Sequence, residues 1–302
     1  MRKEFCSAMV GRADKGNVAF LTGDLGFMAL EPLQEALDEN FINAGIAEQN
    51  MVSVAAAMCK TGLEIWVYSI APFCYGRPFE QIRNDIALHA LPVKLVGNGG
   101  GYGYGVMGPT HHAIEDYGVL LALPGMQACV PVFDDDLEAA VTFIADMQNP
   151  TYLRLGLGEP PMGYVSPAFA PWRQLTSGQG PVVLAVGPLA STYIEMCATM
   201  PIDRRPNLWA VAMLPLEIYF PPKAFLEQLA KARKLVVAEE HVRHGSVGAD
   251  LILWLVERGR PPTHFVHLCA KAHRFDGYGS QSYMRKQSAL DPKSLHSCLN
   301  AL

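Results

Sequence analysis

The sequence predicts an α/β protein built from two units. Between residues 18 and 155, short apolar runs alternate with longer amphipathic stretches, which is the pattern of parallel strands buried on both faces with helices between them. The same alternation returns after residue 181. Of the 302 residues, 50% are hydrophobic and 18% are charged, so the chain has enough apolar side chains to bury a core.

The first unit is expected to span residues 1–160 as a parallel sheet between helices. A short strand should end just before Glu48. The other candidate strands are the apolar runs Val18–Leu21, Ile65–Tyr68, Val93–Val96, Met126–Val130 and Thr151–Leu155. The candidate helices are the amphipathic stretches Leu30–Glu39, Glu48–Thr61, Phe79–Ala90, His112–Leu123 and Asp134–Asp146.

Residues 161–181 are predicted to be a linker, because Gly and Pro recur from residue 156 to residue 181 and interrupt regular elements. The second unit, residues 182–302, is expected to be a smaller α/β domain. Its candidate strands are Val182–Val186, Leu208–Val211, Leu235–Ala238 and His264–His267. Its candidate helices are one that starts at Leu189, then Lys223–Ala230 and Val247–Arg258.

The composition argues against several classes of protein. The net charge is −5 and no block of Lys and Arg occurs, so neither a nucleic acid nor a membrane surface is an expected partner. The N-terminal residues lack the apolar segment of a signal peptide, which predicts a cytoplasmic protein. Seven scattered Cys without a C-x-x-C pair favour reduced thiols. His241 and His244 have the spacing of metal ligands, but no third ligand is near, so no metal site is predicted on this chain.

A carboxylate lies where a short strand gives way to a helix, in the run FINAGIAEQNMVSVAAAM from Phe41 to Met58. By itself Glu48 is an ordinary acid in a first helical turn, favoured by the helix dipole. The run resembles the glutamate motif of the transketolase and deoxyxylulose-phosphate-synthase superfamily. The resemblance implies that the Glu48 carboxyl touches the aminopyrimidine ring of thiamine diphosphate and drives its tautomerism, a step that a partly desolvated carboxyl favours.

The stretch from Tyr68 to Asn84 resembles the aromatic wall of the same family and the helix that follows it. The resemblance implies that Phe73 stacks on the pyrimidine, with Ile70 and Tyr75 completing that wall. An aromatic face supplies apolar area and offset stacking. The alternative is that Phe73 is a plain core residue. Ile70 stands where transketolases usually have another aromatic, so the wall is expected to be thinner here.

The glycine-rich stretch from Gly97 to His112 permits two interpretations. Gly103, Gly105 and Gly108 spell G-x-G-x-x-G, the fingerprint of a dinucleotide site. In that fingerprint the first Gly follows the strand directly and a helix begins within the motif. Here six residues separate Val96 from Gly103, and Pro109 follows the last Gly, which argues against a nucleotide.

Gly108–Asp116 resembles the family motif G-P-T-H-Q-x-x-E instead. The resemblance implies that His111 faces the substrate, because imidazole can donate to a developing alkoxide or carry a proton near neutral pH. His112 is interpreted as structural. Transketolases usually carry Glu-Asp where this chain has Val106-Met107, so a carboxylate that recognises a sugar hydroxyl by hydrogen bonding is missing. The donor and acceptor sugars are therefore left open.

Two arginines match the phosphate-binding arginines of the family. Arg154 ends an apolar strand at the edge where open α/β sheets place ligands, and a guanidinium grips phosphate through parallel hydrogen bonds. The alternative for Arg154 is a structural ion pair, for example with Glu159. Arg2 is a weaker match near the start of the chain.

The resemblance extends into the second unit, where Val236–His241 and Gly245–Gly248 match the E-E-H and glycine signature of the transketolase C-terminal domain. The G-D-G motif that, with a later Asn, holds magnesium and diphosphate in the family is absent from this sequence. The resemblance therefore implies the thiamine-diphosphate-binding fold and an N-terminal transketolase-like partner subunit that carries Mg²⁺ and the diphosphate, in an α2β2 assembly.

The expected function is that of a split transketolase. With its partner, the chain would pass a two-carbon ketol unit from a ketose-type donor, a sugar or sugar phosphate, to an aldehyde. One alternative is a β-type subunit of a 2-oxo-acid decarboxylating enzyme. Another is a subunit that keeps the fold without catalysis, because fold alone does not fix function.

Overall fold

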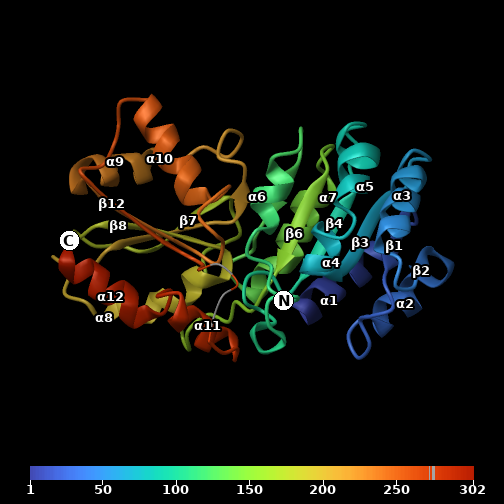
Figure 1. Ribbon diagram of the computed structural model, residues 1–302, viewed down its shortest axis with the longest axis horizontal. Coiled ribbons are helices and arrows are strands. Elements are labelled where there is room, and N and C mark those ends of the chain that lie inside the picture. Colours follow the sequence, from blue (N-terminus) through green and yellow to red (C-terminus); the bar gives the residue numbers. More distant parts are fainter. Residues whose placement is uncertain (272, 274–275) are drawn as a thin grey trace.

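The computed structural model describes residues 1–271, 273 and 276–302, and Figure 1 shows two sheets lying side by side. The sheet of the first unit has seven strands in the order β10-β5-β6-β4-β3-β1-β2. The sheet of the second unit has five strands in the order β12-β11-β8-β9-β7. The predicted α/β class is thereby confirmed.

The first sheet is parallel except at one edge. Its parallel strands are β1 (Val18–Thr22), β2 (Phe41–Asn43), β3 (Glu64–Ile70), β4 (Lys94–Asn98), β5 (Gln127–Cys129) and β6 (Thr151–Leu155). Its α-helices are α1 (Arg2–Ala13), α2 (Glu31–Leu37), α3 (Glu48–Cys59), α4 (Ala71–Tyr75), α5 (Phe79–Gln81), α6 (Asp116–Leu121) and α7 (Leu137–Ala145). A π-helical segment, Ile82–Ala87, continues α5.

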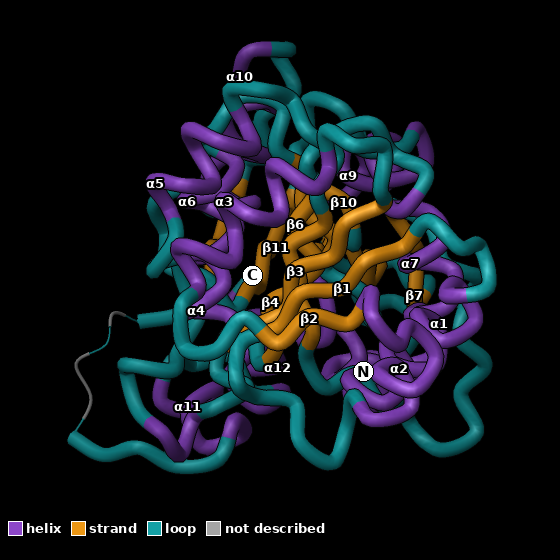
Figure 2. Tube along the Cα trace, turned by 90° about the vertical axis from the view of Figure 1, so that its right-hand side faces the viewer, coloured by secondary structure: helices purple, strands orange, loops and turns teal. Residues whose placement is uncertain are grey.

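Both faces of this sheet are buried, as the unbroken apolar strands predict. Along β1, Ala19 and Leu21 pack with α3, whereas Val18 and Phe20 pack with α1 and α2. Figure 2 shows α3 to α6 on one side of the sheet and α1, α2 and α7 on the other.

The second sheet has parallel strands β8 (Val182–Val186), β9 (Asn207–Val211), β11 (Lys234–Glu239) and β12 (His264–Cys269). Helices α9 (Lys223–Ala232) and α10 (Val247–Glu257) cover one face, and α8 (Ile194–Thr199), α11 (Gln281–Gln287) and α12 (Pro292–Ala301) cover the other.

Two strands depart from the sequence-based prediction. Strand β7 (Trp172–Thr176) pairs antiparallel with β9, although it lies inside the predicted linker 161–181, so part of that segment belongs to the second sheet. Strand β10 (Met213–Leu214) comes from the second unit and pairs antiparallel with β5 in the first. The division between the units is therefore less clean than the predicted boundaries.

The register aligns the carboxyl ends of the three central strands. Ile70 pairs with Asn98, and Asn98 pairs with Leu155, so the segments after β3, β4 and β6 meet at one edge. Such an edge is where open α/β sheets place their ligands.

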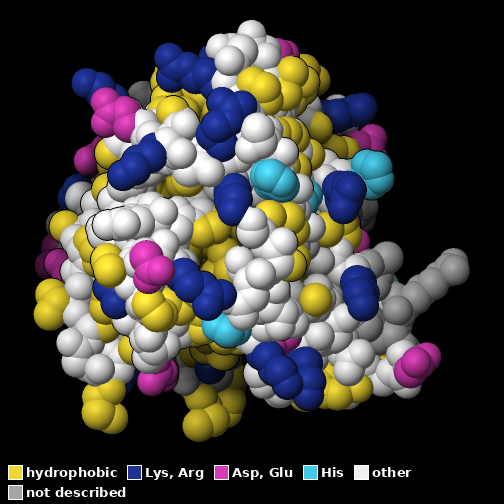
Figure 3. Space-filling model, turned by 90° about the vertical axis from the view of Figure 1, so that its left-hand side faces the viewer, with side chains coloured by type: hydrophobic (Ala, Val, Ile, Leu, Met, Phe, Trp, Pro, Cys, Tyr) yellow, Lys and Arg dark blue, Asp and Glu magenta, His cyan; other side chains and the backbone are white. Residues whose placement is uncertain are grey.

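The surface and the helix lengths add two observations. Figure 3 shows the outer side of the second unit, where side chains of both charges are scattered among neutral and hydrophobic ones. Within the described part of the chain, no helix has the length and apolar character needed to cross a membrane.

Candidate active site

Glu48 opens α3 at the carboxyl edge of the first sheet. Gly45, with φ of +70°, turns the chain between β2 and α3, and its N–H donates to Asn43 Oδ1 over 2.9 Å. Glu48 is 3% exposed, and its Oε2 accepts a hydrogen bond of 2.6 Å from Arg77. A buried carboxylate needs such a partner, because moving a charge out of water without a compensating hydrogen bond is costly. The N-terminus of α3 also favours the negative charge of Glu48.

Phe73 lies on α4, directly after β3, and is half-buried. The guanidinium carbon of Arg77 lies 4.2 Å from the centre of its ring. The ring of His111 approaches the same phenyl group with 5.2 Å between centres in an edge-on arrangement. Glu48, Phe73 and His111, which are far apart in the sequence, thus belong to one cluster.

His111 lies in the segment after β4 and is half-buried between Phe73 and Tyr104, whose ring centre is 6.2 Å away. Its Nδ1 is 2.9 Å from Thr110 Oγ1, so the hydroxyl fixes one ring nitrogen and leaves Nε2 for another group. The chain thereby holds an imidazole at the rim of the cluster.

His112 is buried, with Nε2 3.2 Å from the carbonyl oxygen of Gly105. Burial lowers the pKa of His112, so the ring favours its neutral form. These contacts support the structural role expected for this residue.

The two further residues of the expected wall differ in their surroundings. Ile70 ends β3 and is half-buried. Tyr75 is buried, and its hydroxyl donates to Glu115 Oε2 over 3.2 Å. The other carboxylate oxygen of Glu115 is 2.6 Å from His273 Nε2, so Tyr75 belongs to a polar cluster next to the Phe73 wall.

Arg154 is 4% exposed and lies between the two units. Its Nε is 2.9 Å from Asp116 Oδ2, and one terminal nitrogen donates to the carbonyl oxygens of Ala113 and Glu240 over 2.7 and 2.8 Å. The structural alternative was an ion pair with an acid such as Glu159; Glu159 is exposed, and the acid that pairs with Arg154 is Asp116. This arrangement favours the ion pair over phosphate binding.

The E-E-H segment of the second unit holds the two units together. Glu239 Oε2 accepts a 2.5 Å hydrogen bond from Tyr117 of the first unit. The His241 ring stacks on Tyr117 with 4.0 Å between centres, and its Nε2 accepts from the Gly118 N–H. Glu240 binds Arg285 over 2.8 and 3.1 Å. No local pattern in the sequence indicated the contacts that Glu239 and His241 make with the first unit.

The remaining residues of the prediction lie outside the cluster. Arg2 is exposed at the start of α1 and lines a hollow with Cys6, Met28 and Pro32. Val106 and Met107, which replace the acidic pair of the family, are 69% and 55% exposed.

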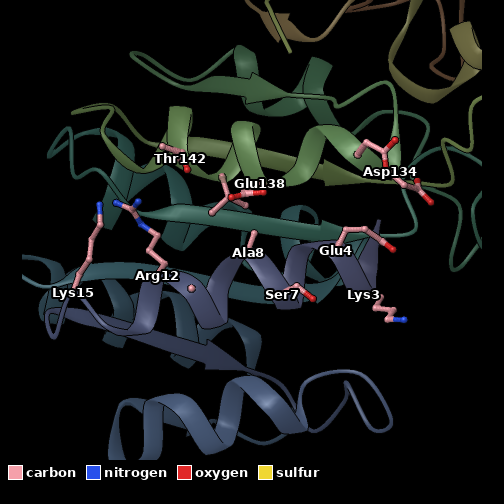
Figure 4. A pocket seen from close by; sticks show the side chains of 12 residues that line it. Lys3, Glu4, Ser7, Ala8, Arg12, Lys15, Asp134, Glu138 and Thr142 are labelled. Atoms are coloured by element: carbon pink, nitrogen blue, oxygen red, sulfur yellow. The ribbon is translucent and has the colours of Figure 1, made fainter. Parts of the chain in front are cut away.

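Another hollow, between α1 and α7, is shown in Figure 4. Arg12 at one end of it is bound to Glu64 over 2.5 and 2.6 Å, and the predicted catalytic residues are not among those that line it. The edge cluster around Glu48 therefore remains the candidate site.

Arg77 is the residue of the cluster that received no role from the sequence. It stands four residues after Phe73, a spacing that places two side chains on the same side of a helical turn. An arginine four residues after the expected stacking aromatic was therefore the sequence signal that could have assigned Arg77 to the site.

The cluster fits an aminopyrimidine ring. The Arg77 guanidinium is a planar group with N–H donors at its edge, and it lies with one nitrogen on Glu48 and its carbon over the Phe73 face. A planar ring with an amine and a protonated nitrogen would meet the same carboxylate and the same aromatic face.

Comparisons with known proteins agree with this geometry. The family model described as "Transketolase, pyrimidine binding domain" matches residues 9–159. The chain is 28% identical over 270 residues to one subunit of the apulose-4-phosphate transketolase of Phocaeicola vulgatus, covering 86% of this chain and 85% of that protein. The subunit of the same name from Actinobacillus succinogenes is 25% identical over 299 residues, covering 98% and 94%.

Solved structures give the same result. A structure titled "Split gene transketolase, inactive beta4 tetramer" matches with a TM-score of 0.82 and 26% identity, covering 99% of this chain and 96% of that chain. Transketolase from Leishmania mexicana shares the fold, with a TM-score of 0.79 and 17% identity over 100% of this chain and 45% of that one. Since the family model spans half of the sequence and the fold agrees along its whole length, the chain belongs to the transketolase family through its pyrimidine-binding domain.

Proposed function

We propose that this chain is the pyrimidine-binding subunit of a two-component transketolase, which transfers a two-carbon ketol unit from a ketose-type donor to an aldehyde. One observation carries the proposal: the Glu48 carboxylate and the face of Phe73 both contact the planar guanidinium of Arg77, and His111 packs beside them. The two named relatives are each one subunit of a transketolase, which supports the division into two chains.

The cofactor in this proposal is thiamine diphosphate, which supplies the carbon nucleophile of the reaction. Glu48 would accept the aminopyrimidine at its buried carboxyl and hold a proton there. Phe73 would fix the plane of the ring by stacking. The carboxylate is well suited to this task because its site excludes water, which strengthens the contact.

His111 would act on the substrate. Its Nδ1 is engaged by Thr110, so its Nε2 is the nitrogen that can donate to or accept from a substrate oxygen. The Phe73 ring packs against the imidazole and restrains its orientation. Proton transfer at this nitrogen serves both half-reactions, because cleavage of the donor removes a proton from a hydroxyl and addition to the aldehyde returns one to the new alkoxide.

The proposal extends to the partner. An N-terminal transketolase-like subunit with the G-D-G motif would bind Mg²⁺ and the diphosphate, in an α2β2 heterotetramer active in carbohydrate metabolism. The described cysteines are free thiols, which suits a cytoplasmic enzyme. The substrate is proposed as a ketose or its phosphate, since both named relatives belong to transketolases of a sugar phosphate.

Reconstitution tests the proposal. The chain would be co-expressed with a neighbouring reading frame that carries the G-D-G motif, and ketol transfer would be measured with ketose phosphates, free ketoses and nucleotide sugars. Activity should require both subunits and thiamine diphosphate. A stable complex that binds the cofactor but transfers no ketol unit, and instead decarboxylates a 2-oxo acid, would replace the proposed function with its alternative.

A further inference from the structure

Arg77 makes both of the contacts proposed for the aminopyrimidine ring. Its NH1 donates to Glu48 Oε2 over 2.6 Å, and its guanidinium carbon lies 4.2 Å from the centre of the Phe73 ring. A guanidinium is planar, positively charged and rich in N–H donors. The side chain therefore occupies the place in which the ring would stack and form its hydrogen bond.

We propose that Arg77 is a latch on the aminopyrimidine subsite: it closes the subsite in the cofactor-free chain and leaves it when thiamine diphosphate binds. The inference rests on the proposed function, because the displacing group is the cofactor of that reaction. The proposal adds Arg77 as a side chain that competes with the aminopyrimidine ring for Glu48 and Phe73.

The difference in burial between the two partners determines which one moves. The Glu48 side chain is 3% exposed, so its carboxylate would be left as a buried, unpaired charge without Arg77 or the cofactor. The Arg77 side chain is 40% exposed, and its guanidinium is readily hydrated once it turns outward. Glu48 therefore stays in place, and Arg77 exchanges its protein contacts for water.

The position of Arg77 permits this exchange without unfolding a helix. The residue stands between α4 and α5, where α4 ends at Tyr75 and α5 begins at Phe79. Rotation about the side-chain torsions of Arg77 is enough to release both contacts, and such rotations occur within nanoseconds on exposed side chains. Phe73 and Glu48 keep the backbone positions that their own elements set.

The latch has a consequence for cofactor binding. When a competent state is only partly populated, the apparent dissociation constant equals the intrinsic one divided by the open fraction, so a mostly closed subsite binds more weakly. The pyrimidine end of the cofactor then gains little affinity from this chain alone. Opening of the subsite depends on the binding energy that the partner subunit supplies when it binds the diphosphate. The isolated subunit is thus protected from capturing a cofactor fragment, and its buried carboxylate is neutralised until assembly.

The first test concerns the ion pair in the chain alone. Unfolding by denaturant would be measured for Arg77→Met, Glu48→Gln and the double variant, which form a double-mutant cycle. The two substitutions should be non-additive, with the double variant more stable than the sum of the single effects predicts. Arg83→Met is the matched control, because Arg83 is exposed and donates to its neighbour Asn84. Additive effects overturn the latch.

The second test concerns the complex with its partner. Calorimetric titration with thiamine diphosphate and Mg²⁺ should show about tenfold tighter binding for Arg77→Met than for the unaltered complex, the scale of one charge-assisted hydrogen bond that no longer competes. Arg83→Met should bind as the unaltered complex does. Arg77→Gln serves the same purpose if the Met variant does not fold.

The outcomes separate the two proposals. Equal or weaker cofactor binding by the Arg77 variants, in a complex that binds the cofactor, overturns the latch and leaves the proposed function intact. A complex that binds no thiamine diphosphate in any form overturns the proposed function and the latch together.

Discussion

At the scale of single residues, charge burial determines what each polar group of the site can do. Glu48 and Arg154 are both nearly inaccessible, at 3% and 4% exposure. Glu48 is paired with a half-exposed side chain, whereas Arg154 is paired with Asp116, whose side chain is fully buried. In our proposal the first pair opens when the cofactor replaces Arg77 on Glu48, whereas the second stays closed because both of its partners are buried. The same pairing of carboxylate and guanidinium thus involves the proposed catalytic carboxylate in one place and forms a structural link in the other.

We predict that Glu48→Gln in the assembled complex lowers turnover by at least about a hundredfold, the usual contribution of a positioned acid or base. The amide keeps the shape of the side chain but cannot take up or release the proton. Cofactor affinity should fall less, because Phe73 and the partner still hold the cofactor. Deuterium exchange of the thiazolium ring proton, followed by NMR, measures the step; Glu80→Gln, an exposed acid on α5, is the control. Equal exchange rates in the Glu48→Gln variant and the unaltered complex would refute the assignment.

Arg154→Met should reduce the free energy of unfolding by about 3–5 kcal/mol, because it leaves the buried Asp116 carboxylate without its counter-charge. Adding Asp116→Asn should recover much of this loss, since no charge then remains unpaired. Denaturant unfolding of the unaltered chain, the single variant and the double variant measures both effects. Unchanged stability together with a higher KM for phosphorylated substrates alone would instead support the phosphate role.

At the scale of elements, the site is assembled by segments that follow parallel strands and by one cluster that joins them to the second unit. Glu115 accepts from Tyr75 over 3.2 Å and from His273 over 2.6 Å. Its carboxylate raises the pKa of His273. Burial opposes ionisation of Glu115, but the hydrogen bond from His273 prevails and lowers the pKa of Glu115. The pair therefore ties His273 to the wall of the candidate site.

The His273 pair makes stability depend on pH in a defined direction. Because the pKa of His273 is raised in the folded state, its contribution is fully present below about pH 6.5, the usual value for histidine, and is lost as the pH rises through the folded value. The unfolding midpoint of His273→Gln should thus lie below that of the unaltered chain at pH 6 and approach it by pH 9. Thermal scans at these pH values measure the difference. The exposed His244→Gln is the control, and a gap that widens with pH would contradict the ion pair.

Strands that form a continuous apolar run could be predicted from the sequence, whereas strands that depend on tertiary contacts could not. The runs that became β1, β3, β4 and β6 are buried on both faces, and such strands leave an unbroken apolar signal. Strand β7 lies in a segment rich in Pro and Gly, and the two residues of β10 pair across the units, so neither leaves a local pattern. In the site, motif resemblance indicated Glu48, Phe73 and His111, whereas the role of Arg77 depends on where its side chain lies in space.

At the scale of the whole molecule, the two units are held together by a buried polar seam. Tyr117 and Arg154 of the first unit bind the carboxylate of Glu239 and the carbonyl oxygen of Glu240 in the second. The Glu239 carboxylate also accepts from the backbone N–H groups of Val247 and Gly248 at the start of α10, which favours its negative charge. Because these groups are buried and paired across the two units, the seam fixes how the second unit sits beside the edge that carries the candidate site.

The close approach of two glycines makes this seam testable. Gly118 on α6 faces Gly245, whose φ of +69° is a conformation that side chains rarely adopt. A Cβ at Gly118 would lie 2.6 Å from the carbonyl oxygen of Gly245 and 2.7 Å from Cε1 of His241, and neither the backbone nor the stacked ring can yield without loosening the seam. We predict that Gly118→Ala lowers the free energy of unfolding by about 1–3 kcal/mol, the typical cost of overpacking.

The control is Gly11→Ala on α1, where a Cβ meets no atom within 4 Å. In a helix interior this change should be neutral or should stabilise by up to about 1 kcal/mol, because Ala has the higher helix propensity. The two substitutions add the same methyl group to a helical glycine, so intrinsic propensity favours both and only the seam distinguishes them. Denaturant unfolding of both variants measures the contrast. If Gly118→Ala were as stable as Gly11→Ala, the contact between Gly118 and Gly245 would not constrain how the two units pack.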